Sequence, residues 1–584
     1  MEESDFEPAQ GLLLGGRDVE SNESVGKPRV NFDLDENQGN SGRKGRYRVL
    51  QHRRSVGGEP KLIKFVFILV IPATILLSLF FILSKSSGSS SRDAVPKTAP
   101  TGSKYQTGFD ITNNWGSISP YFDSGATFKG IDLAKTEGEY GLPSYCSYKQ
   151  VHVLHRHAER YPTSGTGKMM KEVAEKIYAM DEPPVKELSW LETWNYTMGE
   201  DLLVPKGAGT EFASGAQFWS THGRFLYKAL DASNHLFYDR ALNVFENGTS
   251  RPLPVLRATT QSRIQTSARA WAAGFFGIYG GQSYSAVDDY GSGELYKLVL
   301  MAEEQGTNNT LAADYSCPNS DNSSYEIGKS QSKEWIDIYL KDAAVRLQTV
   351  LPGFSNLTAQ DAFGIQSLCS FETAAYGKSS FCELFTETEW RGFEYAADLS
   401  FFGRSSYGSL TSKGEGIGWI SELLARLEGR LITEAGNGVN VTLTGSEETF
   451  PIGQPFYLDM THDSVLVAVL TAMGLDFLEK ELPVNNMPVP RQFIVSRLTP
   501  FGARLYVEVL DCVDDTDVAS YVRLKLNNRV LPLKGLKNCP SSADGLCKLD
   551  KFIDSLKHQI KVVNFDHVCY EDLSDELRAA LEQR

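Results

Sequence analysis

Two arginines and a histidine stand within five residues of one another, directly after a segment with the alternation of a short β-strand. The strand is predicted over residues 150–154, and Arg156, His157 and Arg160 follow it. Ligand sites of α/β sheets lie beyond the carboxyl ends of strands, so this segment is a candidate binding loop. Two guanidinium groups can hold a phosphate dianion through paired hydrogen bonds, with an imidazole between them. The alternative interpretation is a polar loop whose charges are incidental.

The histidines of this segment also allow a metal-site interpretation. The predicted strand and the residues directly after it contain three histidines, His152, His155 and His157. Residues two apart on a strand point to the same face, where two histidines could bind one zinc ion. No catalytic carboxylate or cysteine cluster stands near them in the sequence. An anion-binding loop is therefore favoured over a zinc site.

A histidine and an aspartate, His462 and Asp463, follow a second predicted strand at residues 456–460. A helix is predicted over 464–473, and Asp463 could simply serve as its N-cap. Alone, the pair carries little information. It becomes informative only in conjunction with the first motif, in that order along the chain.

The remaining periodic segments predict how these residues are positioned. Strands are predicted at 254–257, at 504–510 and, as a hairpin turning at Asn527-Asn528, over 522–530. Apolar residues at three- and four-residue spacing predict helices at 264–276, 335–351 and 419–431. The order predicts an α/β core sheet flanked by helices, interrupted by a mainly helical inserted domain.

Residues 65–84 are 20 residues without a charge, long enough to span a bilayer as a transmembrane helix. Eight lysines and arginines precede them from Arg43 on, against four between Lys85 and Lys104, which predicts a cytosolic N-terminus. We expect a disordered cytoplasmic tail (1–64), an uncleaved signal anchor (65–84), a linker (85–107) and a folded domain (108–584) that is lumenal or extracellular. The protein is then a single-pass type II membrane protein of the cell surface or of a vacuole-like compartment.

Charge, cysteines and glycosylation signals agree with that topology. The net charge of −15 argues against wholesale nucleic-acid binding. All eight cysteines lie from Cys146 onward, which favours disulfides in an oxidising compartment over free buried thiols. N-x-[ST] glycosylation signals also lie beyond the anchor, at Asn195, Asn247, Asn308, Asn322, Asn356 and Asn440.

The residues 156–162, which read R-H-A-E-R-Y-P, resemble the R-H-G-x-R-x-P signature of the histidine acid phosphatases. The His462-Asp463 pair is similar to the second motif of that family. Shorter similar stretches run from about Tyr121 to Cys569 and are closest to fungal acid phosphatases and phytases. One position departs from the family pattern, because Ala158 stands where the family has glycine.

The resemblance implies hydrolysis of phosphate monoesters at acidic pH through a phosphohistidine intermediate. It implies that His157 is the nucleophile and Asp463 the proton donor, and that the phosphate is bound by Arg156, Arg160, Arg257 and His462. No metal or other cofactor is expected, because the arginines supply the positive field. The expected partners are a small phosphate monoester and the membrane.

The resemblance also implies four disulfides. The implied pairs are Cys146–Cys512, Cys317–Cys569, Cys369–Cys382 and Cys539–Cys547.

Substrate range and activity leave two alternatives. Lys168 and Lys171 occupy the region where phytases of this family bind additional phosphates, although a solvated helix face explains them as well. Glu159 is expected to add a negative charge near the mouth of the site, which favours a broad phosphomonoesterase over a dedicated phytase. A catalytically weak ectodomain with a binding role is the other alternative, supported by Ala158.

Overall fold

The computed structural model describes residues 108–122, 141–230, 235–277, 295–514, 517–542 and 544–582. The predicted tail, anchor and linker, residues 1–107, lie outside the described residues. Among the helices that are described, none is both long and apolar enough to cross a membrane.

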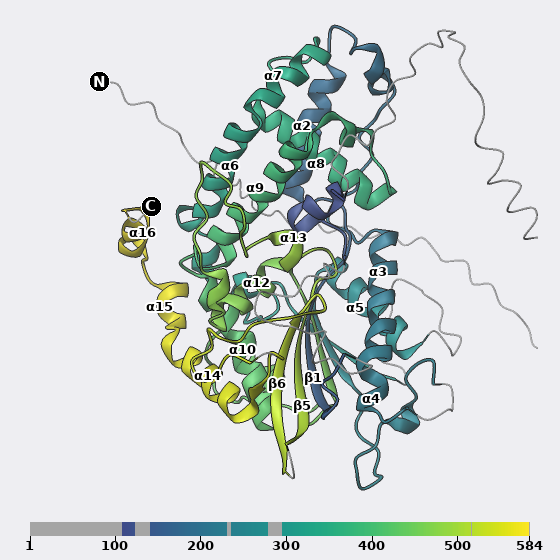
Figure 1. The fold of residues 1–584 in the computed structure, drawn as a ribbon, viewed down its shortest axis with the longest axis vertical. Coiled ribbons are helices and arrows are strands. Elements are labelled where there is room, and N and C mark those ends of the chain that lie inside the picture. The colour runs from purple at the N-terminus through teal and green to yellow at the C-terminus, as the bar shows by residue number, and fades with distance from the viewer. Residues whose placement is uncertain are drawn as a thin grey trace, which may run out of the picture. The chain divides into compact units, whose positions relative to one another are not determined.

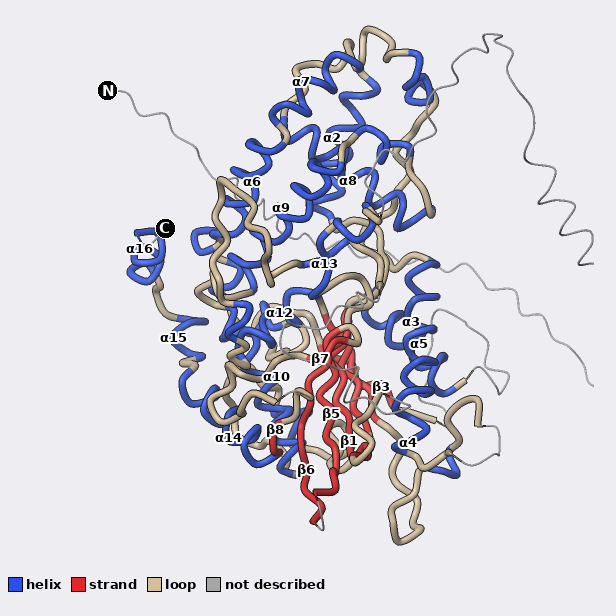
Figure 2. Tube along the Cα trace, in the orientation of Figure 1, coloured by secondary structure: helices blue, strands red, loops and turns tan. Residues whose placement is uncertain are grey.

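The described residues contain eight strands that form one mixed sheet (Figure 2). Its order is β3-β2-β4-β1-β5-β6-β7, and β8 pairs with β6. The strands β3, β2, β4 and β1 run parallel, whereas β5 to β8 pair in antiparallel fashion. Their bounds are β1 Cys146–Arg156, β2 Val255–Thr259, β3 Lys297–Met301, β4 Phe456–Thr461, β5 Arg504–Asp514, β6 Asp517–Leu526, β7 Arg529–Val530 and β8 Cys547–Lys548.

The predicted strands are confirmed, and the hairpin shows why its sequence specifies a turn. Asn527 and Asn528 link β6 to β7 with φ angles of 50° and 67°. A two-residue hairpin turn with both central residues in the left-handed region matches the twist of the flanking strands, and asparagine tolerates that region well. The side-chain oxygen of Asn527 also accepts the backbone N–H of Arg504 at 3.0 Å, which ties the turn to β5.

Helices cover both faces of the sheet (Figure 1). One face carries α3 (Pro205–Phe218) and α5 (Ser262–Phe276), and the other carries α10 (Ser412–Glu428), α12 (Asp463–Ala472) and α14 (Leu549–Val562). The α3–α5 contact depends on glycine. A Cβ atom at Gly215 would lie 2.0 Å from the carbonyl oxygen of Trp271, so any larger residue would force the two helices apart.

A helical insertion lies between β3 and β4 in the chain, as predicted. It contains α6 (Ile327–Tyr339), α7 (Lys341–Val350), α8 (Ala359–Tyr376) and α9 (Glu387–Ser405), and α2 (Ser164–Tyr178) packs on α8. The single helix predicted over 335–351 is wrong, because the chain breaks at Leu340. The two parts pack mainly on different partners, α6 on α9 and α7 on α8. The shorter helices are α4 (Arg224–Leu226), α11 (Val441–Thr444), α13 (Val495–Leu498), α15 (Phe565–Tyr570) and α16 (Ser574–Glu582).

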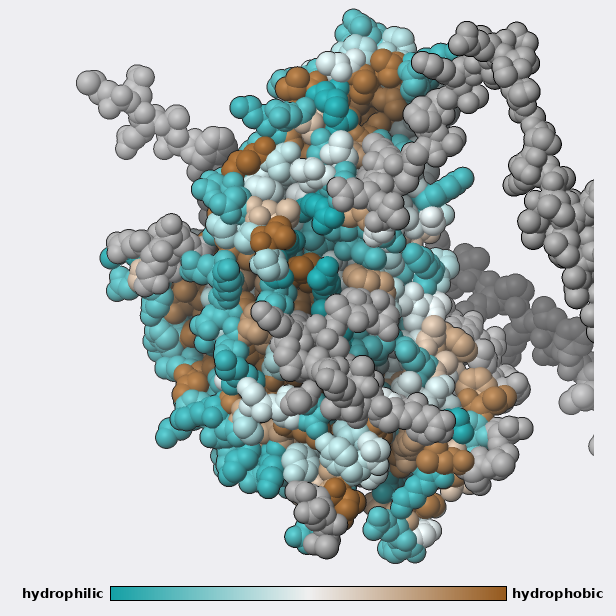
Figure 3. All heavy atoms as spheres, viewed as in Figure 1, coloured by the Kyte–Doolittle hydropathy of each residue, from teal (hydrophilic) through white to brown (hydrophobic). Residues whose placement is uncertain are grey.

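The helical insertion gathers beyond the end of the sheet at which β1 and β4 finish (Figure 1). Hydrophilic side chains dominate the face of the molecule in Figure 3, with apolar residues dispersed among them. The apolar residues of α10 and α12 are instead buried in a core shared by the sheet and the insertion.

Four disulfides join the pairs that the resemblance implies: Cys146–Cys512, Cys317–Cys569, Cys369–Cys382 and Cys539–Cys547. The first pair closes a loop of 366 residues and links β1 to β5 at positions that are also paired in the sheet. Closing so long a loop stabilises the fold by roughly 5 kcal/mol through the lost entropy of the unfolded chain.

Candidate active site

The carboxyl ends of the four parallel strands meet at one edge of the sheet, and each strand is followed by a polar side chain. His157 follows β1, and His462 with Asp463 follows β4. Arg263 lies in the first turn of the helix after β2, and Glu303 lies two residues beyond β3. Parallel pairing therefore gathers residues that are far apart in the sequence.

A backbone hydrogen bond joins the two sequence motifs directly. Residues Arg156 and Thr461 are partners in the β1–β4 register, and the N–H of His157 donates to the carbonyl oxygen of Thr461 at 3.1 Å. The imidazole of His157 consequently lies edge-on to that of His462, with ring centroids 6.1 Å apart.

The tautomer of His157 is set by its own main chain. Its Nδ1 lies 2.8 Å from the carbonyl oxygen of Ala158, and a carbonyl can only accept a hydrogen bond. Nδ1 must therefore carry the proton, which leaves a lone pair on Nε2. That nitrogen is the nucleophilic position of a neutral imidazole.

The surroundings of His157 keep it neutral. Burial lowers the pKa of its imidazole well below the usual value, and nearby positive charges lower it further. Those charges belong to Arg156, Arg263, Arg160 and His462. A neutral, unprotonated Nε2 is therefore available even in acid.

Arg156 is held in a fixed orientation beneath the site. Its Nη1 donates to the carbonyl oxygens of Ser117, at 2.5 Å, and Thr499, at 2.7 Å. Its Nη2 lies 2.7 Å from a carboxylate oxygen of Asp463, and its guanidinium group lies 4.6 Å from the ring centre of Phe501. These contacts come from three separate segments of the chain, since Thr499 and Phe501 belong to the same loop after α13.

Asp463 belongs to the site, although one of its carboxylate oxygens also accepts the N–H of Ser464 in the first turn of α12, at 3.0 Å. It is the first residue of α12 rather than the N-cap, and the N-cap position makes no side-chain capping bond. Burial by itself raises the pKa of the Asp463 carboxyl, but Arg156, Arg160 and His462 outweigh burial and lower it below the usual value. In the unliganded site the carboxyl is therefore ionised.

Three arginines with similar surroundings converge here. Arg160 and Arg156 flank His157, and Arg263 reaches the same place from α5, where its Nη1 donates to the Asp201 carboxylate at 3.0 Å. Burial and the charges of Arg263 and Arg156 lower the pKa of Arg160 to about 9. So large a reduction in the pKa of Arg160 means that the positive charges of the three arginines are incompletely neutralised, although Asp463 and Asp201 lie close by. A bound anion would relieve this repulsion.

Arg257 does not join this group, which corrects the role that the sequence assigned to it. Its Nε donates to Asp459 at 2.7 Å and its Nη2 donates to Glu422 at 2.6 Å. Although burial opposes it, these two carboxylates raise the pKa of Arg257 above the usual value, so its charge is already satisfied. Arg257 pairs with Asp459 in the β2–β4 register and points from mid-strand towards α10, away from the strand ends.

Arg263 occupies the position in the site that was expected for Arg257. Its location beyond the end of β2 could have identified it from the sequence. Arg257 precedes the last residue of β2, whereas Arg263 follows it and opens the next helix. His157 and Asp463 also lie beyond the ends of their strands. The same rule of position, applied to β2, selects Arg263.

Glu303 is the second residue that the sequence did not reveal. One of its carboxylate oxygens lies 2.9 Å from Nε2 of His462, which must donate its proton there. Burial raises the pKa of Glu303, but the hydrogen bond and charge of His462 reverse the effect and lower it. Because Nε2 is engaged, Nδ1 is the nitrogen of His462 left to face an anion.

The other histidines of the first motif have separate partners, which argues against a zinc cluster. His152 stacks on Tyr457, and His155 bonds to Ser214 through Nε2 at 2.8 Å. Burial lowers the pKa of His155 to about 3, so it is a neutral core residue. Across the described part of the chain, no three histidine, cysteine or carboxylate side chains are grouped as metal ligands would be.

The two unusual residues of the motif fit the backbone without strain. Ala158 is fully buried and has no positive φ angle, so its methyl group meets no conformational penalty. Glu159 is also buried, 3.5 Å from Lys206, rather than at the mouth of the site as expected. Lys168 is exposed on α2, and Lys171 pairs with Glu200 at 3.3 Å on the surface.

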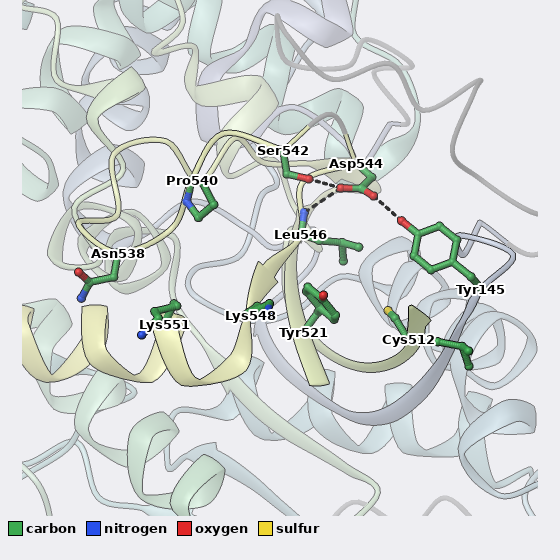
Figure 4. Close-up of a pocket in the computed structure, with 11 residues that line it drawn as sticks. Tyr145, Cys512, Tyr521, Asn538, Pro540, Ser542, Asp544, Leu546, Lys548 and Lys551 are labelled. Carbon is green, nitrogen blue, oxygen red and sulfur yellow. Dashed lines mark hydrogen bonds between the residues drawn. The ribbon is translucent and has the colours of Figure 1, made fainter. Parts of the chain in front are cut away.

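A separate cavity of about 820 Å³ lies at the opposite end of β1, beside the Cys146–Cys512 disulfide. Figure 4 shows Asp544 there, accepting hydrogen bonds from Tyr145 and Ser542. None of the residues from the two sequence motifs lines this cavity. The candidate active site is therefore the carboxyl edge of the sheet.

Comparison with known proteins agrees with the motifs. Residues 148–527 match the family model of the histidine phosphatase superfamily, branch 2. Phytase A of Emericella nidulans is 30% identical over 496 residues, covering 83% of this chain and 96% of that protein. Phytase A of Aspergillus oryzae is 28% identical over 495 residues, with the same two coverages.

Solved structures show the same fold. The phytase from D. castellii superposes with a TM-score of 0.61 at 21% identity, covering 79% of this chain and 88% of that one. The multiple inositol polyphosphate phosphatase of Bifidobacterium longum, in complex with phosphate, gives a TM-score of 0.51 at 14% identity, covering 78% and 99%. At these identities the likeness concerns the α/β fold alone.

The contrast between Arg263 and Arg257 predicts opposite effects of two matched substitutions. Arg263→Gln removes an incompletely neutralised cation, so the inhibition constant of inorganic phosphate should rise by about 10- to 100-fold with little change in Tm. Arg257→Gln leaves two buried carboxylates short of a partner and should cost about 3–5 kcal/mol of stability. Inhibition assays and thermal unfolding of both variants measure this. Normal phosphate inhibition in Arg263→Gln would exclude Arg263 from the site.

Proposed function

The chain belongs to the histidine phosphatase superfamily, branch 2, whose members hydrolyse phosphate monoesters, and we propose that its phosphoryl acceptor is Nε2 of His157. The hydrogen bond from Nδ1 to the carbonyl oxygen of Ala158 is the observation that carries this proposal, because it leaves Nε2 unprotonated. The low pKa of the imidazole keeps that nitrogen available in acid.

In the first step the phosphate group binds among Arg156, Arg160, Arg263 and His462, and Nε2 of His157 attacks phosphorus in line with the leaving oxygen. The P–O bond breaks as the P–N bond forms. The arginines stabilise the charge that spreads over the equatorial oxygens. Nε2 of His462 donates a hydrogen bond to Glu303, which orients the ring so that Nδ1 faces the same oxygens.

Asp463 supplies the proton that the leaving alkoxide needs. Its carboxyl is ionised in the free site because Arg156 and Arg160 lower its pKa, but a bound phosphate anion draws on the same arginines and raises that pKa. Below about pH 6 a phosphate monoester is a monoanion and carries one proton into the site. That proton can pass through Asp463 to the leaving oxygen, which accounts for a preference for acid.

In the second step the phosphohistidine is hydrolysed. The alcohol departs, water takes its place, and Asp463, now ionised, removes a proton from the water as it attacks phosphorus. The P–N bond breaks, Nε2 of His157 regains its lone pair, and Asp463 passes its proton to the inorganic phosphate that leaves. Apart from the substrate and water, every group that acts in these steps is a side chain of this protein.

We propose a broad phosphomonoesterase, with inositol hexakisphosphate hydrolysis as the alternative. Lys171 is exposed and paired with Glu200, and Lys168 lies on the solvent face of α2, so neither shows a preformed site for a second phosphate. The alternative is favoured by the relatives, which are named Phytase A.

The catalytic domain is proposed to lie outside the cytosol, anchored by residues 65–84. Four disulfides and the exposed glycosylation signals, such as Asn195 and Asn247, agree with an oxidising, glycosylating compartment. The anchor itself rests on the uncharged run of 20 residues. Protease protection of an N-terminal tag in sealed vesicles tests the orientation, since a cytosolic tag is cleaved without detergent.

The substrate proposal predicts comparable efficiency on simple and on highly phosphorylated esters. Values of kcat/KM for glycerol phosphate and inositol hexakisphosphate should agree within about 10-fold. A contact with one further phosphate would make the two values differ by more, and no such contact is proposed. Both are measured by phosphate release in acid, with His157→Ala as the blank. A preference of about 100-fold or more for the hexakisphosphate would make the protein a dedicated phytase.

The role of Asp463 predicts a dependence on the leaving group. Asp463→Asn should lower kcat on glycerol phosphate by about 10²–10⁴-fold, because an alkoxide needs a proton to depart. The loss on p-nitrophenyl phosphate should be much smaller, since p-nitrophenolate departs with little help. Equal losses on the two substrates would mean that Asp463 positions Arg156 or phosphate and that the proton comes from another group.

A further inference from the structure

Arg156 is oriented by two segments that lie outside both sequence motifs. Its Nη1 donates to the carbonyl oxygen of Ser117, from the segment that precedes the sheet, and to that of Thr499, which follows α13. Residues 110–119, here called the N-terminal strap, contain two short 3₁₀ helices, Ile111–Asn114 and Gly116–Ile118. The strap precedes the matched family region, which begins at residue 148.

One buried carboxylate holds both segments. Glu394 of α9 accepts the N–H of Gly116 at 2.8 Å on one oxygen and the N–H of Ser496 at 2.9 Å on the other. Each of these donors lies within three residues of a carbonyl that holds Arg156. Glu394 itself is only 2% exposed, so water does not compete for its oxygens.

The strap fits α9 closely enough to be specific. Gly116 has a φ of +57°, and a Cβ atom there would lie 2.3 Å from the Cβ of Ala397 on α9. Neighbouring Trp115 is buried against Trp390 of the same helix, with ring centroids 6.1 Å apart. A residue larger than glycine at position 116 would lift the strap from α9.

The strap also joins the loop that carries the ring under Arg156. The N–H of Phe501 donates to the carbonyl oxygen of Ser119 at 2.9 Å, and the N–H of Gly502 donates to the carbonyl oxygen of His157 at 3.0 Å. The ring of Phe501 supports the guanidinium of Arg156. The strap, the loop after α13 and the first motif therefore form one hydrogen-bonded unit.

We propose that Glu394 is a positioning residue for catalysis, which clamps the N-terminal strap and the α13 segment so that their carbonyl oxygens fix the guanidinium of Arg156 for phosphate binding. The proposal rests on the phosphate-binding role of Arg156. With Nη1 fixed by the two carbonyls, Nη2 is left to Asp463 and to the substrate. Loss of the clamp frees the guanidinium to rotate away from both.

Two substitutions in the full-length chain test the clamp from opposite sides. Glu394→Gln replaces one oxygen with an amide NH₂, which cannot accept, so one of the two backbone N–H groups loses its acceptor. Gly116→Ala displaces the strap and leaves the carboxylate intact. Each variant should raise the inhibition constant of inorganic phosphate by about 10- to 100-fold, because a displacement near 1 Å costs that much at a site.

A matched control separates this effect from a general loss of structure. Asp361 is a buried carboxylate on α8 that also accepts a backbone N–H, from Thr358 at 2.9 Å, but has no link to Arg156. Asp361→Asn should leave phosphate inhibition unchanged even where its Tm falls. Glu394→Gln must weaken phosphate binding at temperatures well below its own Tm.

A double-mutant cycle with Arg156→Lys decides the mechanism. If Glu394 acts through Arg156, Glu394→Gln should add little to the loss of phosphate affinity already caused by Arg156→Lys. The positioning role would be overturned if the losses of phosphate affinity from Glu394→Gln and Arg156→Lys multiplied in the double variant. Normal phosphate inhibition in Glu394→Gln and Gly116→Ala would also overturn it. Unimpaired phosphate inhibition in Arg156→Lys alone would instead overturn the proposed role of Arg156 in the site.

Discussion

The parallel register of β1 and β4 is the constraint on which the rest of the site depends. It pairs Arg156 with Thr461, so that the chain leaves both strands at the same level and the main chains join through the hydrogen bond from His157 to Thr461. Roughly 300 residues of sequence separate the two motifs. A shift of one residue would turn every side chain of the shifted strand to the other face of the sheet and separate His157 from Asp463. The disulfide Cys146–Cys512 ties β1 to β5 at its other end.

The second feature of the site is an excess of positive charge, which favours the binding of a phosphate anion. Arg257, inside the fold, is fully compensated by Asp459 and Glu422, and it holds neighbouring strands to α10. Arg160 and Arg263 at the edge are only partly compensated, and burial adds to the cost of keeping them charged. That cost is recovered when an anion binds. The same field keeps His157 neutral and Asp463 ionised until substrate arrives.

The sequence predicted β1, β2, β4, β5 and the β6–β7 hairpin, the helices α5, α10 and α12, and both motifs, because apolar periodicity and position after a strand are local signals. It did not predict β3 or most of the other helices, among them α2, α3, α8 and α9. The prediction of one long helix over 335–351 was wrong because its two halves pack mainly on different helices, and no local sequence pattern encodes those contacts. The resemblance implied Arg257, which lies within the strand, whereas the strand ends at Thr259 and Arg263 is the arginine beyond that end. Glu303 and Glu394 act through residues distant in sequence. Their roles depend on tertiary contacts, and the residues that precede them carry no motif.

Turnover is proposed to pass through a phosphoryl group on Nε2 of His157. The direct measurement is to mix the enzyme with labelled substrate, stop the reaction in base within one turnover, and locate the label by residue and by ring nitrogen. Phosphohistidine survives base, and the hydrogen bond from Nδ1 to the Ala158 carbonyl predicts one phosphoryl group on Nε2 of His157. A label on Nδ1, a label on His155 or His462, or the absence of any phosphoenzyme during turnover would contradict the account.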